Sequence, residues 1–357
     1  MTLRRRTLIS ASASALALAA AGVLPAHAQQ NAAEDAALMK LYNEAVAAGE
    51  TELVIYGAYA GLFRPIWELF TKRFPKIEIV GNPVSGAQMA AKLDAEFSSG
   101  QQTADIVTSG LTELLAAVEQ GRAEPFRPPN IASLPERYRD PKDRFVINYA
   151  ELYGVVYNTN KLKPSDLPNK PADLLDPRYK GMIIDDPLGA RTTELAWIEL
   201  YNSGKIDAAF IKAMKAQSTV VPSTAPFFNQ LTTGTVAMIP WGGHARYLSL
   251  KNAGAPVGFH AVPGLAVPVL AGTVVLKGAP HPKAARLFQA WFLSTEAQNA
   301  IVQLGNSYGL TATVSLPDNP ADWPKLMPIA AALKPVPPDQ FIPARDALRK
   351  AVEANFK

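Results

Sequence analysis

The sequence predicts an α/β protein in which helices flank a mostly parallel sheet. Between residues 53 and 120, short apolar segments of β-prone residues alternate with segments of helical periodicity. Strands that alternate with helices are joined by crossovers, which place helices on both faces of a parallel sheet. The length of 357 residues allows two packed lobes, so we expect a two-lobed α/β protein.

Each expected element of the first half has a recognisable apolar pattern. Residues 53–57 read as a buried strand that ends in a glycine turn, and the aromatic and aliphatic residues of 61–74 fall on one stripe of a helix. A helix at 35–48 precedes them. After them we expect a strand at 77–80, a helix marked by Met89, Leu93 and Phe97, a strand at 104–108 and a helix at 111–120.

The second half begins where residues 145–158 cross from one lobe to the other. A Lys/Pro-rich turn, a short helix from Pro171 and a buried strand at 182–184 follow. Turn residues at 262–269 are expected to return the chain to the first lobe. The remaining expected elements are helices at 193–200, 206–216, 244–251, 281–298 and 343–357, and strands at 236–240 and 271–276.

The first 28 residues have the pattern of a secretory signal. Arg4, Arg5 and Arg6 are followed by an apolar region at 8–24 and an A-x-A site that ends at Ala28. Serines interrupt the apolar region, which disfavours a membrane anchor. The arginines also resemble a twin-arginine motif, so the Sec and twin-arginine routes both stay open. We expect residues 1–28 to be removed and the mature protein to be free in the periplasm.

Composition excludes several classes of function. The formal charge of +4 includes the three arginines of the signal, and without them 32 Lys and Arg face 31 Asp and Glu, a net charge of +1. This balance gives no reason to expect a nucleic-acid partner. The chain has no cysteine, so thiol nucleophiles, thiolate metal sites and disulfides are ruled out.

Two segments carry a family resemblance. Residues 152–187, LYGVVYNTNKLKPSDLPNKPADLLDPRYKGMIIDDP, read as strand, turn, short helix and strand. This order resembles the passage from the first to the second lobe in the solute-binding proteins of ABC importers, and the closest likeness is to the ferric-iron-type (family 1/6) extracellular proteins. Residues 281–298 are similar to a helix that these proteins carry before a Gln and an apolar run.

The resemblance implies a type II-like periplasmic-binding-protein fold with a ligand cleft between its lobes. Lobe 1 would comprise residues 29–150 with 265–315, and lobe 2 residues 151–264 with 316–357, joined by crossings near 149–157 and 262–268. It implies a monomer without a cofactor that binds a small-molecule ligand by lobe closure. Its partners would be ABC permease subunits in the inner membrane.

Candidate ligand-binding residues lie at strand ends and helix starts, where such a cleft is lined. Glycines allow close approach, helix N-termini favour anions, Arg grips a carboxylate or phosphate, and Trp stacks on a planar guest. Several of these residues have a purely structural alternative. The aromatic residues could lie in the core, and the serines could cap helices. The Arg could be solvated or paired with Asp185 or Asp186, and the His could make a local hydrogen bond. The candidates are Tyr59, Ser85, Gly86, Ser109, Arg191, Thr192, Trp241, Gly243, His244 and Arg246.

The sequence lacks the tyrosine pair that a ferric-iron-binding protein of this family would be expected to have. That branch usually places two adjacent tyrosines just before the helix that starts here near His244, because Fe³⁺ prefers anionic oxygen ligands. This sequence has Trp241 there, a lone Tyr247 beside Arg246, and no Tyr-Tyr pair anywhere. We therefore expect no metal site and favour an organic or phosphorus oxyanion as the solute.

Two other classes of function were weighed. A hydrolase lacks support, because the chain contains no G-x-S-x-G elbow, no H-E-x-x-H, no P-loop and no dinucleotide fingerprint. The pair Asp185-Asp186 is followed by Pro187 and is more typical of a turn than of acid/base catalysis. A periplasmic sensor adaptor shares the expected fold, and sequence alone does not separate it from an importer subunit.

Overall fold

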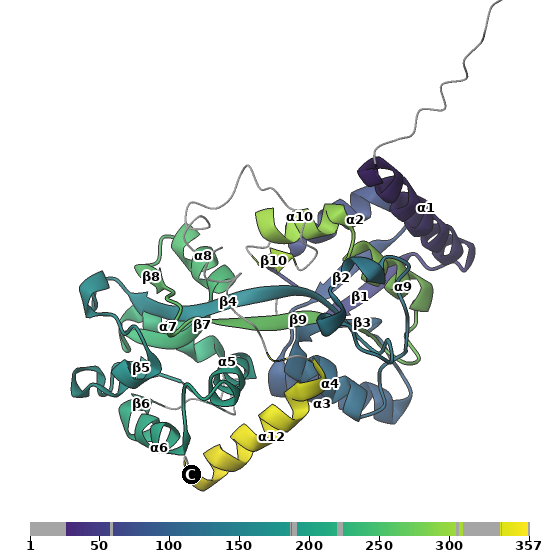
Figure 1. Ribbon diagram of the computed structural model, residues 1–357. Helices are drawn as coiled ribbons and strands as arrows, with labels where there is room; N and C mark the ends of the chain where they lie inside the picture. The colour runs from purple at the N-terminus through teal and green to yellow at the C-terminus, as the bar shows by residue number, and fades with distance from the viewer. Residues whose placement is uncertain are drawn as a thin grey trace, which may run out of the picture.

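The protein is described here by a computed structural model, which covers residues 26–57, 60–185, 187, 191–219, 224–304, 307–309, 336 and 338–355. The predicted signal at 1–28 lies mostly outside the described residues. Two long antiparallel strands, β4 (Val146–Asn158) and β9 (Val267–Val275), run through the middle of the molecule. Figure 1 shows one group of strands and helices at each end of this pair. These groups are the two lobes that the sequence predicted.

Lobe 1 is built on three parallel strands, β1 (Glu52–Tyr56), β2 (Glu78–Asn82) and β3 (Ile106–Gly110). Both faces of β1 are buried: Leu53 and Ile55 pack on one side, Val54 and Tyr56 on the other. The helices of this lobe are α1 (Ala26–Ala47), α2 (Arg64–Arg73), α3 (Gly86–Ser99), α4 (Leu111–Glu119), α9 (Pro282–Trp291) and α10 (Thr295–Gln303), with η1 (Ile131–Ser133) and η2 (Glu136–Tyr138) in the connection to β4.

Lobe 2 contains a second parallel set, β5 (Ile183–Ile184), β6 (Ser218–Thr219) and β7 (Met238–Gly243), with β8 (Val257–His260) paired to β4. Its helices are α5 (Arg191–Asn202), α6 (Ala208–Gln217), α7 (Thr224–Thr233) and α8 (His244–Asn252), preceded by η3 (Pro164–Asp166), η4 (Pro171–Leu175) and η5 (Pro177–Tyr179). The C-terminal helix α12 (Pro338–Asn355) packs on α5 and α6.

The strands of both lobes form one sheet of ten strands. Its order is β2-β1-β3-β9-β4-β7-β5-β6, with β8 and the short β10 (Tyr308–Gly309) also paired to β4. Parallel strands lie at both ends of this order, and the antiparallel strands β9 and β4 lie between them. Because the same two strands belong to both lobes, they are the crossing segments.

Strand β4 is irregular where it passes between the lobes. Its pairing shifts register between Ile147 and Tyr149 and again between Gly154 and Val156, and such bulges bend a strand. Asn148 lies at the first shift. Its carbonyl oxygen accepts a hydrogen bond from a side chain outside the paired strands, Gln298 Nε2, at 3.0 Å. The amide of Gln298 therefore supports the crossing strand.

A cluster of aromatic rings forms the core of lobe 1 on the α2 and α9 face. Phe63, Ile66, Phe70 and Phe74, the stripe predicted for the helix at 61–74, are all fully buried. Phe70 meets Trp291 of α9 edge-on, with ring centroids 5.2 Å apart. Edge-on pairs of this kind add to the stability that buried area provides, and they fix α2 and α9 against one face of the sheet.

The structure departs from the predicted elements at several places. The helix predicted at 281–298 is two helices, because Ser294 accepts a hydrogen bond from Ala297 N and caps a new one. Strand β7 continues past Pro240 to Gly243, β9 begins at Val267 instead of residue 271, and α12 begins at Pro338 instead of residue 343. Helix α7, strand β8 and the short strands β6 and β10 were not predicted. Among the described residues, none of the helices combines the length and apolarity needed to span a bilayer.

Asp105 joins the start of β3 to two other elements. Its fully buried carboxylate accepts hydrogen bonds from Val54 N at 2.8 Å, His281 N at 2.6 Å and His281 Nδ1 at 3.0 Å. Replacement by Ala leaves buried N–H groups without an acceptor, so we expect Asp105→Ala to lower the free energy of unfolding by about 3 kcal/mol. Urea unfolding measures this change.

Asp94→Ala is the matched control for Asp105→Ala. Asp94 pairs with Arg122 at the surface and its side chain is 57% exposed, and such pairs contribute about 1 kcal/mol or less. Equal losses of stability in the two variants would contradict the anchoring role of Asp105.

Glu199 ties α5 to the segment before α12. Both of its oxygens accept from Val336 N, at 3.0 and 2.9 Å, and burial raises the pKa of Glu199 to about 8. The folded state therefore keeps a proton that the unfolded state releases near pH 4.5, so the stability of the protein falls as the pH rises from about 4.5 to 8.

We expect Glu199→Gln to remove this pH dependence, because the amide is neutral and its oxygen still accepts from Val336. The melting temperature of the variant should exceed that of the wild type by more at pH 8.5 than at pH 5. Melting curves at both values test this. A constant offset between the two proteins at both pH values would show that Glu199 does not titrate differently on folding.

Candidate functional site

The candidate site lies where the parallel strands of the two lobes end. Strand β3 ends at Gly110, which is the N-cap of α4, and β7 ends at Gly243, which is the N-cap of α8. Both glycines have extended backbone angles, and neither helix has a side-chain cap. At the start of one helix in each lobe, the cap residue therefore offers no side chain to the first-turn N–H groups.

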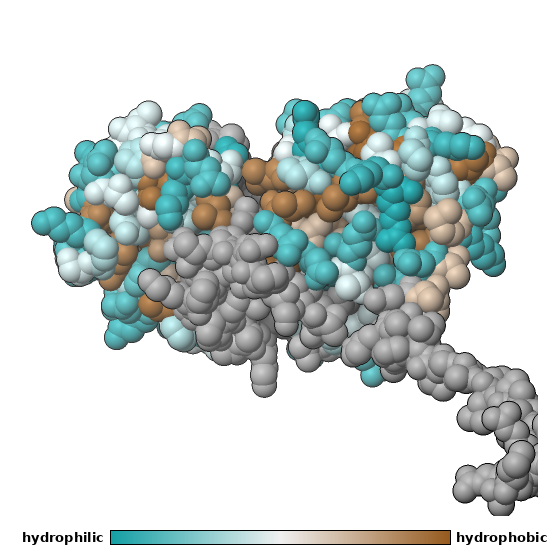
Figure 2. Space-filling model, turned by 90° about the horizontal axis from the view of Figure 1, so that it is seen from above, coloured by the Kyte–Doolittle hydropathy of each residue, from teal (hydrophilic) through white to brown (hydrophobic). Residues whose placement is uncertain are grey.

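Side chains approach both strand ends closely. A Cβ on Gly110 would lie 2.6 Å from Cδ1 of Leu195 in α5, so lobe 1 touches lobe 2 there. A Cβ on Gly243 would lie 2.8 Å from Glu151 Oε2 and 3.2 Å from Tyr153 Cε1. Figure 2 shows a notch between the two masses of the molecule, with hydrophobic residues gathered beside it.

Buried carboxylates accompany both glycine caps. Glu113, in the first turn of α4, is 9% exposed, and Glu151, in the crossing strand β4, is 2% exposed. Tyr149 of the same strand is fully buried, and its pKa is raised well above the usual value, first by burial and then by the negative charge of Glu151. Its hydroxyl therefore stays protonated at neutral pH.

The first turn of α5 is a third part of the site. Thr193 and Glu194 are buried, and Glu194 Oε1 accepts from Arg349 Nε at 2.8 Å. Asp185, at the end of β5, accepts from Trp197 Nε1 at 2.8 Å. Asp185 therefore has a partner in a core indole, a contact that the turn interpretation did not include, and Asp186 lies outside the described residues.

Residues 55–299 match the profile of a family described as bacterial extracellular solute-binding proteins. The chain belongs to this family. The match covers most of both lobes, including the crossing strands and the glycine caps of α4 and α8, and it agrees with the resemblance seen in the sequence.

Proteins similar to this chain include a curated relative and solved structures. The "Fe(3+)-binding periplasmic protein" of Serratia marcescens is 24% identical over 303 residues, which is 82% of this chain and 87% of that protein. The "substrate binding protein of the ABC transporter from Agrobacterium tumefaciens" superposes with a TM-score of 0.73 at 17% identity, covering 86% of this chain and 95% of that one. AfuA from Actinobacillus pleuropneumoniae, solved with "exogenous fructose-6-phosphate bound", gives 0.68 at 23% identity, covering 85% and 98%.

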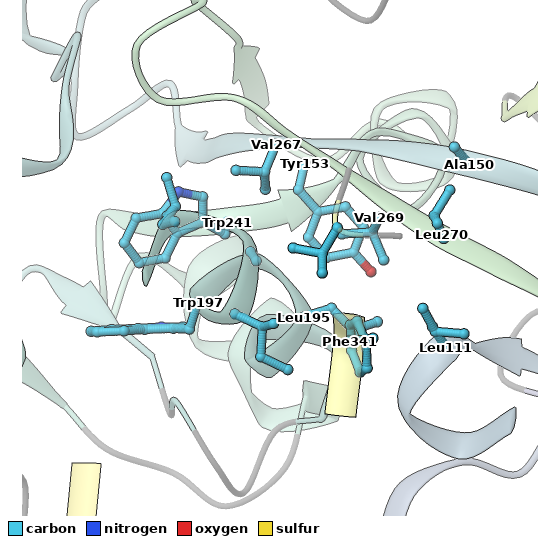
Figure 3. Close-up of a cluster of buried hydrophobic side chains, with 14 of the residues drawn as sticks. Leu111, Ala150, Tyr153, Leu195, Trp197, Trp241, Val267, Val269, Leu270 and Phe341 are labelled. Atoms are coloured by element: carbon cyan, nitrogen blue, oxygen red, sulfur yellow. The ribbon is translucent and has the colours of Figure 1, made fainter. Parts of the chain in front are cut away.

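Trp241 of this solute-binding protein lies in the core. This was the structural alternative to a role in stacking on a ligand. It is fully buried, its Nε1 donates to the carbonyl of Leu265 at 3.2 Å, and it meets Trp197 edge-on with ring centroids 5.3 Å apart. Figure 3 shows Trp241 among Trp197, Val267 and other apolar side chains. In this arrangement the indole packs in the core and does not present a face for stacking on a guest.

His244 and Arg246 lie on different sides of α8. His244 is 1% exposed, and its ring packs edge-on against Phe259, with centroids 5.0 Å apart. The guanidinium of Arg246 is exposed and lies 5.4 Å from the ring of Phe228. The ring of His244, directly after Gly243, is thus packed among the aromatic side chains of lobe 2, and Arg246 faces outward.

The serine candidates have different environments. Ser85 is exposed at the N-cap of α3 but its hydroxyl makes no capping bond, and Gly86 behind it has a positive φ of 58°. Ser109 is 2% exposed and pairs with Gly272 of β9 inside the sheet. Tyr59 lies outside the described residues, and so do the side chains of Arg191 and Thr192, whose backbone begins α5.

Glu113, Glu151 and Tyr149 were missed by the sequence analysis. A signal for Glu151 exists, because it is the one charged residue in the apolar run of β4, VINYAELYGVVYN. A lone charge in a buried strand demands a partner or a ligand nearby. Glu113 has a weaker signal, since an acidic residue in a first helical turn is also a common way to stabilise a helix.

Tyr247, the lone tyrosine near the start of α8, is a core residue. Tyr247 is 4% exposed and stacks on Phe259 with an interplanar angle of 25°, within the apolar core of lobe 2. Across the part of the chain that the structure describes, no group of three or more His, Asp or Glu side chains could hold a metal ion.

We expect Gly243→Ala to destabilise the solute-binding protein by about 1–3 kcal/mol, because the added methyl group would overlap Glu151 and Tyr153. Gly61→Ala is the control, since a Cβ there meets nothing within 4 Å. Thermal or urea unfolding of both variants measures the difference. Unchanged stability of Gly243→Ala would mean that Glu151 moves away freely and that the close approach is not a constraint.

Proposed function

We propose that this protein is the exported, periplasmic solute-binding component of an ABC import system. It captures a small solute by closing its two lobes and delivers it to permease subunits in the inner membrane. Family membership supports this role, as does the fold shared with the Agrobacterium tumefaciens substrate-binding protein over 86% of this chain. Ligand that bridges both lobes would stabilise the closed arrangement.

The solute is an organic or phosphorus oxyanion. One observation carries this proposal: a helix from each lobe, α4 and α8, starts at a strand end with a glycine N-cap and no capping side chain. Helix N-termini of this kind offer backbone N–H groups and a positive dipole end to an anion. Arg191, at the first position of α5, would add a charged donor from lobe 2.

A sugar phosphate is a candidate of this class. The AfuA relative, which is 23% identical to this chain, was solved with fructose 6-phosphate. Such a solute combines an oxyanion for a helix start with hydroxyl groups, which can donate hydrogen bonds to acidic side chains. Glu113 and Glu151 lie beside the two glycine caps.

A thermal-shift screen of the mature protein tests the solute class, because a ligand that binds only the folded state raises the melting temperature. The panel is fructose 6-phosphate, citrate, inorganic phosphate, spermidine and ferric ion with and without carbonate. We expect the hydroxylated oxyanions to raise the melting temperature and ferric ion alone to leave it unchanged. A response to ferric ion or spermidine, with none to any oxyanion, would overturn the oxyanion proposal.

Ferric iron is the second candidate, favoured by the similarity to the Fe(3+)-binding protein of Serratia marcescens over 82% of this chain. Against it stand the missing Tyr-Tyr pair and the core position of Tyr247. The raised pKa of Tyr149 also keeps that phenol protonated, whereas a hard metal ion binds the phenolate.

We expect Arg191→Ala to weaken binding of the oxyanion found in the screen by about 1–3 kcal/mol, the contribution of a charge-assisted hydrogen bond. Arg178→Ala is the control, because Arg178 is 52% exposed and pairs with Asp176 in η5. Calorimetric titration of both variants gives the affinities. Equal affinities for Arg191→Ala and the wild type would remove Arg191 from the site.

A further inference from the structure

Helix α12 is anchored on lobe 2. It packs against α5 and α6, and Phe341, Leu348 and Val352 are buried in the core. Arg349 adds an ion pair to Glu194 of α5, with Nη2 and Oε1 2.8 Å apart. These contacts make α12 a part of lobe 2, although it is the last described helix of the chain.

The same helix reaches across to lobe 1. Arg345 Nη1 and Nη2 donate to Glu119 Oε2 and Oε1 at 3.0 and 3.1 Å, so the guanidinium and the carboxylate form a two-bond pair. Glu119 is the last residue of α4. The Arg345 side chain is only 9% exposed, and Asp346 also contacts it at 2.9 Å.

Lobe 2 therefore touches both ends of α4. At the start of α4, Leu195 of α5 lies against Gly110, and at its end Arg345 of α12 holds Glu119. Figure 3 shows Leu111, Leu195 and Phe341, from α4, α5 and α12, gathered below the crossing strands. These contacts lie at a distance from the crossing strands. A rotation of one lobe against the other about β4 and β9 would therefore displace the contacting residues relative to each other.

We propose that α12 is a strap whose Arg345–Glu119 pair sets the balance between the lobe arrangements of this protein. A pair with two parallel hydrogen bonds tolerates little displacement, because both bonds need distances near 3 Å and good alignment. A hinge rotation that shifts α4 by a few ångströms breaks it. The pair thus stabilises the arrangement described here relative to any other, whatever the solute is.

The chain offers a direct way to measure this balance. It has no cysteine, so Glu68→Cys in α2 and Lys212→Cys in α6 provide two exposed labelling sites, one in each lobe. Single-molecule energy transfer between dyes at these sites reports the distribution of interlobe distances without any solute. The full mature chain is used throughout.

In this background we expect Arg345→Gln and Glu119→Gln each to change the ratio of the interlobe populations by about threefold or more. The double variant should match either single variant, because each change already removes the whole pair. Glu119 is 40% exposed, so Glu119→Gln keeps the test valid if Arg345→Gln folds poorly.

Arg349→Gln is the matched control. It removes an ion pair of the same helix, but the partner, Glu194, lies in the same lobe. It should lower the melting temperature without changing the interlobe distances. The proposal is overturned if Arg345→Gln and Glu119→Gln leave the distance distribution unchanged, or if Arg349→Gln shifts it equally. Neither outcome depends on the identity of the solute, so the result is separate from that of the ligand screen.

Discussion

The pairing of β4 with β9 is the interaction on which the rest of this structure depends. The two strands run antiparallel from Val146 opposite Thr273 to Tyr153 opposite Val267. Lobe 1 joins this ribbon through β3 on β9, and lobe 2 joins it through β7 on β4. One continuous sheet therefore carries two lobes, and a change in the bend of two strands is enough to move one lobe against the other.

Glycines make that ribbon possible. A Cβ on Gly272 would lie 2.0 Å from the carbonyl oxygen of Val146, and one on Gly242 would lie 2.5 Å from Val156 Cγ2. These are the places where β4 shifts its register, so the backbones come closer there than side chains allow. The bent crossing strand then places Glu151 beside Gly243 at the start of α8, while Tyr149 packs with Phe63 and Phe292 in the core of lobe 1.

The charges of the site follow from this arrangement. Helix α4 of lobe 1 and α8 of lobe 2 each start beside the ribbon, and a buried carboxylate lies next to each start. The protein thus places acids of its own beside positive helix ends. The strap that we propose for α12 contacts the other end of α4.

The sequence by itself determined the order of most strands and helices, because apolar periodicity and turn residues are local signals that reflect burial on one or both faces. It also determined the family. The tertiary structure decided what no local pattern holds: that Trp241 is a core residue, that Ser109 pairs inside the sheet, and that Arg345 meets Glu119 across 226 positions of chain. Such contacts depend on how distant elements pack, and a side chain's surroundings are set only when the lobes and the last helix are assembled.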